Sequence, residues 1–236
     1  SAASDVYKRQ LSRWESSLDE LFFVPEERPV VFQLFDNDTE RILQAALKEF
    51  ARSGYGGGRV DRIAKNAGVN KAMIFYYFSS KENLFKLVLS RVLMKLINQV
   101  QTVLRKSRVP EDLIQTLPRT YIGFFRKNPD ILKMIALELV QNPRHITALV
   151  SEIFGSVPTP PQKLFHSRIL QWHDEGLISE DDPVHFIMNI VSLSIFSILG
   201  VPVVEAIFNL KIDRDQGFFE KRIQSIVHLL KKGILE

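Results

Sequence analysis

The polar side chains that follow Gly68 have the types and spacing needed to bind nucleic acid. Asn70 is a good N-cap residue, so a short helix can begin at Lys71 and end at Phe78. Ile74 and Phe78 are one turn apart and would both face inward. The outward face then carries an ammonium group, a thioether and two phenols, from Lys71, Met73, Tyr76 and Tyr77. Such groups suit base edges and phosphate oxygens, so this helix is the first candidate for a functional site.

The stretch from Arg59 to Leu84, RVDRIAKNAGVNKAMIFYYFSSKENL, contains the elements that would position these side chains. Residues 61–66 predict a first short helix, and Gly68 lies in a small-residue corner where glycine adopts positive φ at low steric cost. The sequence Ser79-Ser80-Lys81-Glu82 has the form S-x-x-E, which predicts a capping box at the start of a third helix. Two short helices around a glycine corner predict a helix-turn-helix.

Within this stretch, the pattern IAxxAGVNKxxIxYYFxSKExL resembles the DNA-binding segment of the TetR/AcrR family of bacterial transcriptional repressors. The resemblance covers residues 39–84. Phe75 stands where members usually carry Tyr, and Gly58 and Arg59 stand where they usually carry Ser or Thr. The resemblance implies an all-α fold, with an N-terminal three-helix helix-turn-helix domain and a C-terminal helical bundle for ligand binding and dimerisation. It also implies a homodimeric repressor that binds double-stranded operator DNA and a small apolar effector.

The helix-turn-helix geometry assigns two sets of DNA contacts. The start of the second helix approaches base edges in the major groove. The expected base contacts are Asn70, Lys71, Ala72 and Met73, and the expected phosphate contacts are Arg59, Tyr76, Tyr77 and Lys81. Two such helices in a dimer must lie about 34–36 Å apart, so we expect a palindromic operator.

The charge distribution agrees with this assignment. The chain of 236 residues has a net charge of +4, from 31 Lys and Arg against 27 Asp and Glu. Residues 39–106 hold 13 basic and 4 acidic residues, which leaves 18 and 23 for the rest, so the two parts carry +9 and −5. A basic module joined to an acidic one is typical of a protein that binds a polyanion.

The chain divides into three expected segments. Residues 1–35 are expected to form an N-terminal extension that is partly non-native or disordered, with an amphipathic pattern over 11–23. Residues 36–82 are expected to form the DNA-binding domain, and residues 83–236 the ligand-binding and dimerisation domain. A helix starting near residue 80 and ending near 106 would belong to both domains. Prolines separate the further helices expected over 111–127, 130–142, 144–155, 161–176, 184–208 and 216–235.

Residues 186–204 carry no charged side chain and are long enough to cross a membrane. We favour a buried helix instead, because Asn189, Gly200 and Pro202 interrupt the run and its flanks show no basic bias. One side of this helix would face its own bundle and the other a second chain. The residues expected at the dimer interface are Ile195, Leu199, Ile223, Ile226 and Leu230.

Other chemistry finds little support in the sequence. The five histidines lack a tight metal spacing, there is no cysteine, and no G-x-S-x-G or phosphate-binding motif occurs, so we expect neither an enzyme nor a metal nor a cofactor. A ligand pocket between the helices of the bundle would be lined by Phe124, Met134, Phe154, Phe165, Trp172 and His173. The expected location is cytoplasmic. The alternative is an all-α small-molecule binding protein or enzyme that does not bind DNA.

Overall fold

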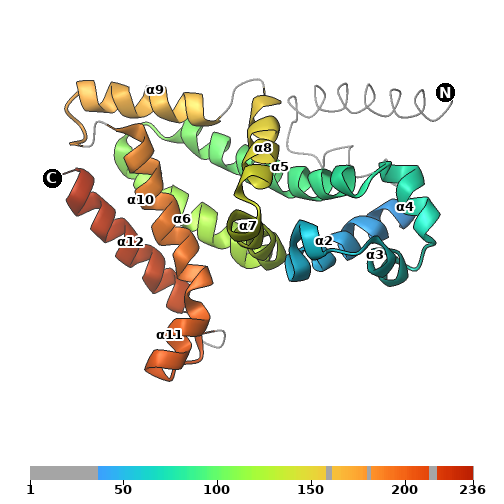
Figure 1. Ribbon diagram of the computed structural model, residues 1–236. Helices are drawn as coiled ribbons and strands as arrows, with labels where there is room; N and C mark the ends of the chain where they lie inside the picture. Colours follow the sequence, from blue (N-terminus) through green and yellow to red (C-terminus); the bar gives the residue numbers. More distant parts are fainter. Residues whose placement is uncertain (1–36, 158–160, 180–181, 213–216, 236) are drawn as a thin grey trace. The chain divides into compact units, whose positions relative to one another are not determined.

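The computed structural model of the protein describes residues 37–157, 161–179, 182–212 and 217–235, and these ranges contain helices and no strand (Figure 1). The prediction of an all-α protein is therefore confirmed. The pattern over residues 11–23 lies outside the described residues. The helices are α2 (Asn37–Gly57), α3 (Val60–Ala67), α4 (Lys71–Phe78), α5 (Lys81–Lys106), α6 (Pro110–Lys127), α7 (Pro129–Gln141), α8 (Pro143–Gly155), α9 (Pro161–Asp174), α10 (Pro183–Leu199), α11 (Val201–Phe208) and α12 (Phe218–Ile234).

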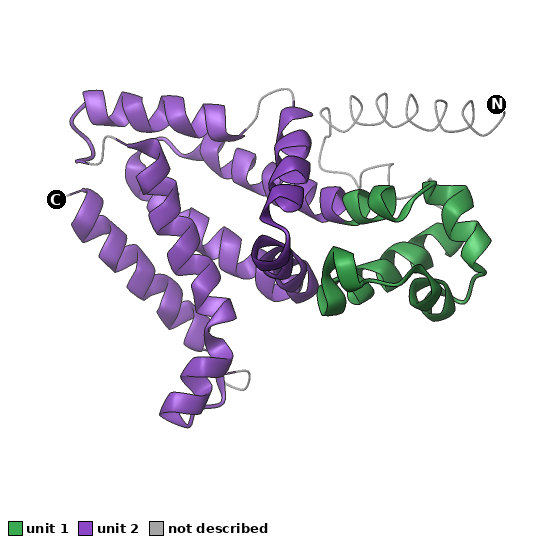
Figure 2. Cartoon of the chain, viewed as in Figure 1, with its two compact units in different colours: residues 1–88 green, residues 89–236 purple. Residues whose placement is uncertain are grey.

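The first compact unit ends at Val88 and contains α2, α3, α4 and the first two turns of α5 (Figure 2). Its division from the second unit comes six residues after the expected boundary at 82, because the start of α5 packs on the helix-turn-helix. Leu84 and Phe85 are completely buried there, and the Phe50 and Phe85 rings meet edge to face at 4.9 Å. The unit thus buries an aromatic core beneath α3 and α4.

The helix α5 runs without a break from the first unit into the second. The expected capping box is wrong in register by one residue. Ser80 takes the N-cap role, and its Oγ accepts a hydrogen bond from the Asn83 N–H at 3.0 Å. Ser79 instead adopts φ 63° and closes α4 through its N–H to the Phe75 carbonyl. Ser79 therefore ends α4, and Ser80 caps the start of α5.

In the second unit, proline begins five of the helices: Pro110, Pro129, Pro143, Pro161 and Pro183. We expected most of these helices to start one residue later. Proline suits the first helical position because it lacks the N–H that would have no partner there. Helix α6 packs against both α10 and α12, α7 packs against α8, and α9 packs against α10.

The segment expected as one helix over 184–208 is two, α10 and α11, which meet at Gly200 with a bend of 59°. Helix α10 buries Phe186 and Ile190, whereas α11 buries no side chain in its own chain. Length and hydropathy would allow α5, and this bent pair taken together, to cross a membrane. For α5, 44% of the apolar window is buried inside the protein.

Candidate nucleic-acid interface

The turn between α3 and α4 sets the position of α4. Gly68 adopts φ 68° and ψ 35°, the left-handed conformation that glycine reaches without steric cost. Its N–H donates to the Lys65 carbonyl at 3.2 Å, and the next N–H, of Val69, donates to Ala64 at 3.1 Å. These bonds end α3 within one residue. The chain is then free to start α4 at a large angle, as a helix-turn-helix requires.

The cap at Asn70 confirms the expected start of α4. The Asn70 side-chain oxygen accepts a hydrogen bond from the Met73 N–H at 2.9 Å. Ile74 and Phe78 are buried against the rest of the unit. Of the four expected base contacts, Asn70, Lys71 and Ala72 are exposed and Met73 is half-buried. The N-terminal end of α4 therefore presents a side-chain face that nothing in the described part of its own unit covers.

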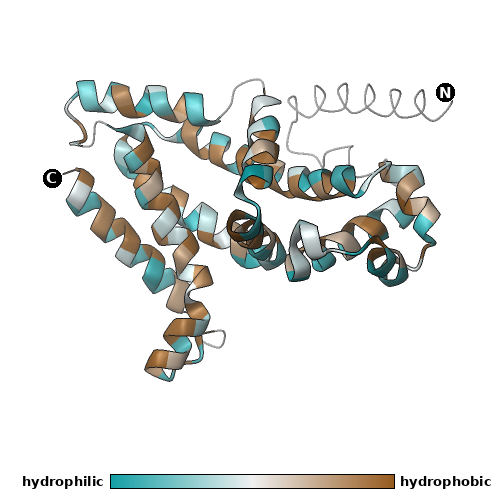
Figure 3. Cartoon of the chain, in the orientation of Figure 1, coloured by the Kyte–Doolittle hydropathy of each residue, from teal (hydrophilic) through white to brown (hydrophobic). Residues whose placement is uncertain are grey.

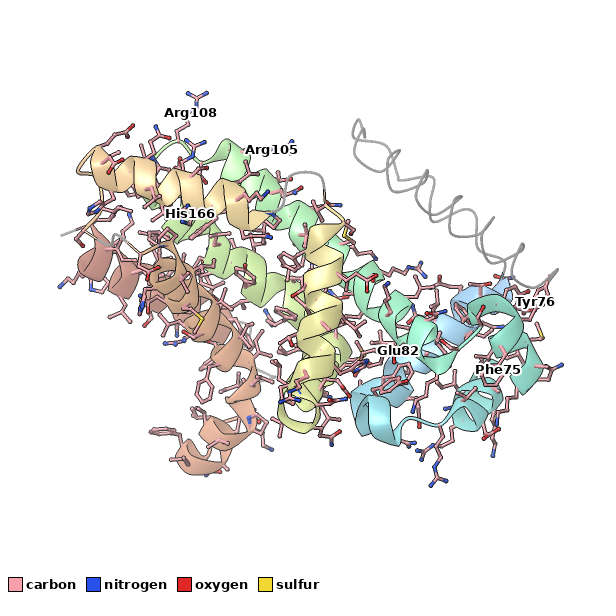
Figure 4. All side chains as sticks on the ribbon, turned by 45° about the horizontal axis from the view of Figure 1, so that its top comes forward. Phe75, Tyr76, Glu82, Arg105, Arg108 and His166 are labelled. Carbon is pink, nitrogen blue, oxygen red and sulfur yellow. The ribbon has the colours of Figure 1, made fainter. Side chains whose placement is uncertain are left out.

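Two aromatic residues extend this exposed face along α4 (Figure 4). Tyr76 is 71% exposed and Phe75 is 41% exposed. The ring of Tyr76 meets the half-buried ring of Tyr77 edge to face at 5.4 Å. The sequence analysis noted Phe75 only as a departure from a pattern and gave it no role. Its exposure adds an apolar contact beside the two phenols.

Lys71 already has a partner on α3. Its Nζ lies 2.9 Å from one carboxylate oxygen of Asp61 and 3.2 Å from the other, and both side chains are largely exposed. The pair joins the two helices of the motif across the turn. Because it lies in water it contributes little to stability, so an acceptor on DNA can compete for the ammonium group.

A buried carboxylate at Glu49 holds the start of α3. One oxygen accepts a hydrogen bond from the Arg59 N–H at 3.0 Å and forms an ion pair with Arg62 at 2.8 Å. The other oxygen forms an ion pair with Arg52 at 3.0 Å. The Glu49 side chain is 1% exposed. Arg59 is the N-cap residue of α3, so Glu49 fixes the backbone of an expected phosphate contact. The sequence analysis missed this residue; its signal was a carboxylate on the otherwise apolar face of α2.

The loop between α2 and α3 needs a residue without a side chain at position 58. A Cβ at this position would come within 2.7 Å of the Phe50 ring, which is closer than any side chain tolerates. The Ser or Thr that the resemblance led us to expect therefore cannot fit here without moving the core.

The expected phosphate contacts surround the exposed end of α4 within the first unit. Arg59 and Tyr76 are exposed, and Tyr77 and Lys81 are half-buried. The Lys81 ammonium group lies 4.6 Å from the centre of the Tyr55 ring, whose edge packs on Phe85 at 5.3 Å. A cation over an aromatic face is held near one position. Lys81 is thus partly ordered before any anion binds.

The expected pocket residues are packed rather than open. Phe124, Met134, Phe165 and Trp172 are buried, and Phe154 and His173 are half-buried. The two best-formed hollows among the described residues do not include any of the six; one lies on α2 and α3, and the other lies between α5 and α9. The Nδ1 atom of His173 is buried without a hydrogen-bond partner. Such an atom is costly in a closed core, so it marks the place where a polar group of a ligand would be best accommodated.

Burial corrects the expected dimer interface. Ile223, Ile226 and Leu230 are 6%, 1% and 4% exposed, because α12 turns these residues toward α6 and α10 of its own chain. Ile195 is half-buried, and only Leu199 of the five is exposed. Exposed apolar residues of α10, α11 and α12 are Val184, Met188, Phe196, Leu199, Val203, Ile207, Phe208 and Leu229. Figure 3 shows that hydrophobic residues predominate along α11.

An ion pair between α6 and α12 is the second feature that the sequence did not predict. The guanidinium of Arg119 on α6 binds both carboxylate oxygens of Glu220 on α12, with one bond of 2.6 Å. This contact lowers the pKa of Glu220 and raises that of Arg119. It fixes the N-terminal turn of α12 against the bundle.

The chain is similar to proteins that regulate transcription. Residues 42–88 match the family described as bacterial regulatory proteins, tetR family. The HTH-type transcriptional regulator RutR of Escherichia coli K12 is 28% identical over 193 residues, which cover 82% of this chain and 88% of RutR. The HTH-type transcriptional repressor NicS of Pseudomonas putida is 33% identical over 114 residues, covering 48% of this chain and 53% of NicS.

The fold is similar to that of the transcriptional regulator FadR from Bacillus subtilis, solved in complex with stearoyl-CoA. The TM-score is 0.61, and the match covers 82% of this chain and 98% of FadR at 18% sequence identity. At that identity the likeness concerns the fold alone.

Proposed function

Because the chain belongs to the TetR family of bacterial transcriptional regulators, we propose that it acts as a repressor, which binds a palindromic operator as a homodimer and is released by a small, largely apolar ligand. DNA binding itself follows from the family. The observation that carries the proposal is the exposed N-terminal end of α4, with Asn70, Lys71 and Ala72 facing solvent. A cytoplasmic location follows from the same role.

Base recognition would come from the first turn of α4. The Lys71 ammonium group can donate to guanine O6 and N7, and Met73 can contact a thymine methyl group. Ala72 is small enough to let the backbone approach the bases. Phe75 and Tyr76 come one turn later and would lie against the sugar-phosphate backbone or a further methyl group.

Phosphate binding would come from Arg59, Tyr76, Tyr77 and Lys81. The Glu49 carboxylate supports this role, because it orders the Arg59 backbone at the start of α3. These contacts fix the register of α4 in the groove but do not read sequence.

The homodimer would form through the exposed apolar face of α10 and α11. Phe196, Ile207 and Phe208 are each more than 65% exposed, although side chains of this kind are normally withdrawn from water. Contiguous apolar surface on a soluble protein marks an interaction site. The interface is therefore proposed from these residues in place of Ile223, Ile226 and Leu230.

The ligand would bind within the second unit and act on DNA through α5. The buried, unpartnered Nδ1 of His173 supports a ligand that is apolar over most of its surface and carries at least one hydrogen-bonding group. FadR of Bacillus subtilis binds stearoyl-CoA, a molecule with a long apolar chain. We propose that the core around Phe165 and Trp172 opens to admit a ligand, since these residues are closely packed in the described state.

Selection of bound DNA from a random pool tests the proposed function directly. We expect an enriched inverted repeat whose half-sites lie on one face of the duplex. Its affinity should fall steeply with salt, because phosphate contacts release counterions. An enrichment that yields no repeat, with binding independent of salt, would exclude the proposal.

A ligand found by thermal-shift screening provides the second test. Its affinity for the protein should fall in the presence of operator DNA by the same factor by which the ligand weakens operator binding. A tenfold to hundredfold effect corresponds to about 1.4–2.8 kcal/mol of coupling. Equal affinities with and without operator would show that the ligand is not an inducer.

A further inference from the structure

A small groove lies between the last turn of α5 and the side of α9, within the second unit. Its volume is about 150 Å³, and its lining residues are Leu104, Arg105, Leu164, Ser167, Arg168 and Gln171. Pockets that enclose a whole drug-sized ligand measure about 300–1,000 Å³. This groove can therefore hold one chemical group but not an entire effector.

The guanidinium of Arg168 faces this groove without an anionic partner. It is half-buried, and its carbon lies 5.5 Å from the centre of the Trp172 ring. No carboxylate among the described residues lies within ion-pair distance of it. Removing a cation from water is costly unless an anion compensates. Stacking on Trp172 also holds the planar fork of hydrogen-bond donors in one orientation.

The chain segments that line the groove are rich in basic residues and contain no acidic residue. Residues 98–110 and 161–173 contain no Asp or Glu, and their basic residues are Arg105, Lys106, Arg108, Lys163 and Arg168. Figure 4 shows Arg105 and Arg108 at the end of α5 and His166 on α9 beside it. Of these basic residues, Arg105 from α5 and Arg168 from α9 line the groove itself.

The two nearest carboxylates already have other partners. Asp112 accepts hydrogen bonds from the backbone N–H groups of Arg108 and Val109, at 2.8 and 3.3 Å. Glu175 accepts from the Gln171 side chain at 2.7 Å. Neither bonds to Arg105 or Arg168, so the groove keeps its positive charge.

We propose that this groove binds the phosphoryl group of a soluble ligand. Two guanidinium groups can each give two parallel hydrogen bonds to such a group, and the Gln171 amide, which uses one N–H on Glu175, has a second N–H to donate. A dianion with several acceptor oxygens matches this set better than a neutral group does. The site is distinct from the DNA-binding face, since every residue that forms it lies after Leu89.

Calorimetric titration of the full chain with sodium pyrophosphate tests the proposal, with glycerol 3-phosphate as a second probe for organic phosphoesters. Sodium chloride of equal ionic strength serves as the blank. We expect saturable pyrophosphate binding that Arg105→Gln and Arg168→Gln each weaken about tenfold to hundredfold, because each variant removes charge-assisted hydrogen bonds. Glycerol 3-phosphate should bind in the same way if organic phosphoesters are the natural source of the group.

Lys133→Gln is the matched control, because Lys133 is exposed on α7 and loses the same charge away from the groove. Circular dichroism confirms that each variant is folded, and Arg168→Lys, which keeps the charge but loses the fork, should bind with intermediate affinity. Unchanged binding in both arginine variants, an equal loss in Lys133→Gln, or binding only to anionic vesicles would overturn the proposal. Operator affinity is measured separately, so this site and the proposed function can fail independently.

Discussion

Replacing Glu49 by glutamine should loosen the start of α3 and weaken DNA binding together. The side chain keeps its shape, and one oxygen can still accept from the Arg59 N–H. It loses its charge opposite both Arg52 and Arg62, however, and its new NH₂ group faces Arg52, which is a donor itself. Removing one partner of a fully buried ion pair costs about 3–5 kcal/mol. Because these arginines are 61% and 42% exposed and can turn into water, we expect a smaller loss, about 1–3 kcal/mol.

Native-state hydrogen exchange over residues 60–67 measures this loss where it arises, without requiring the two units to unfold together. Operator affinity, measured by fluorescence anisotropy, should fall about fivefold, which corresponds to about 1 kcal/mol. Glu40→Gln, at a half-buried position of the same helix where the amide oxygen can still accept from Gln44, should stay within about 0.5 kcal/mol of the parent. If Glu49→Gln also stayed within that range in both assays, the carboxylate would not organise the interface.

Three further predictions follow from the described residues. Lys71→Ala should cost about 1–3 kcal/mol and relax preference at one base pair in a DNA selection, whereas Lys81→Ala should weaken all sequences alike and reduce the salt slope by about one. Phe196→Asp should dissociate the dimer in analytical ultracentrifugation and leave a folded chain, whereas Ile226→Asp should unfold the second unit, because its side chain is 1% exposed within its own chain. Burial raises the pKa of Tyr121 to about 12. Since an unfolded tyrosine titrates near pH 10, urea unfolding should show stability falling by about 1–2 kcal/mol between pH 10 and 12, and Tyr121→Phe should abolish that fall.

The local elements could be predicted from the sequence because their causes are local. The cap at Asn70 and the corner at Gly68 act over four residues, and both are found as expected. The helix starts in the second unit needed only the rule that proline favours the first helical position. The one-residue error at Ser80 is also local, because it concerns only which of two adjacent serines caps α5.

The features that were missed depend on tertiary structure. Glu49 meets Arg59 across ten residues, and no periodic pattern reveals that contact. The stripe of Ile223, Ile226 and Leu230 is equally consistent with packing on its own bundle or on a second chain. Only the positions of α6 and α10 decide between them, and they cover this stripe. Periodicity identifies an apolar face but not the surface that buries it.

The continuity of α5 gives a physical reason why ligand and DNA can affect each other. Leu84, Phe85 and Val88 are buried in the first unit, and Ile97, Val100 and Leu104 are buried on the part of the same helix that lies in the second. A helix of 26 residues is about 39 Å long at 1.5 Å per residue. A tilt of a few degrees at one end therefore moves the other by a few ångströms, which is enough to misplace α4 in a groove.

Such a movement alone does not make a switch. A ligand shifts the equilibrium only by its different affinity for the two states of the protein. In the described state the core around Trp172 is closed, so a ligand that needs it open binds the other state better. In the proposed mechanism, the free energy needed to open that core limits how large the coupling between ligand and operator can be.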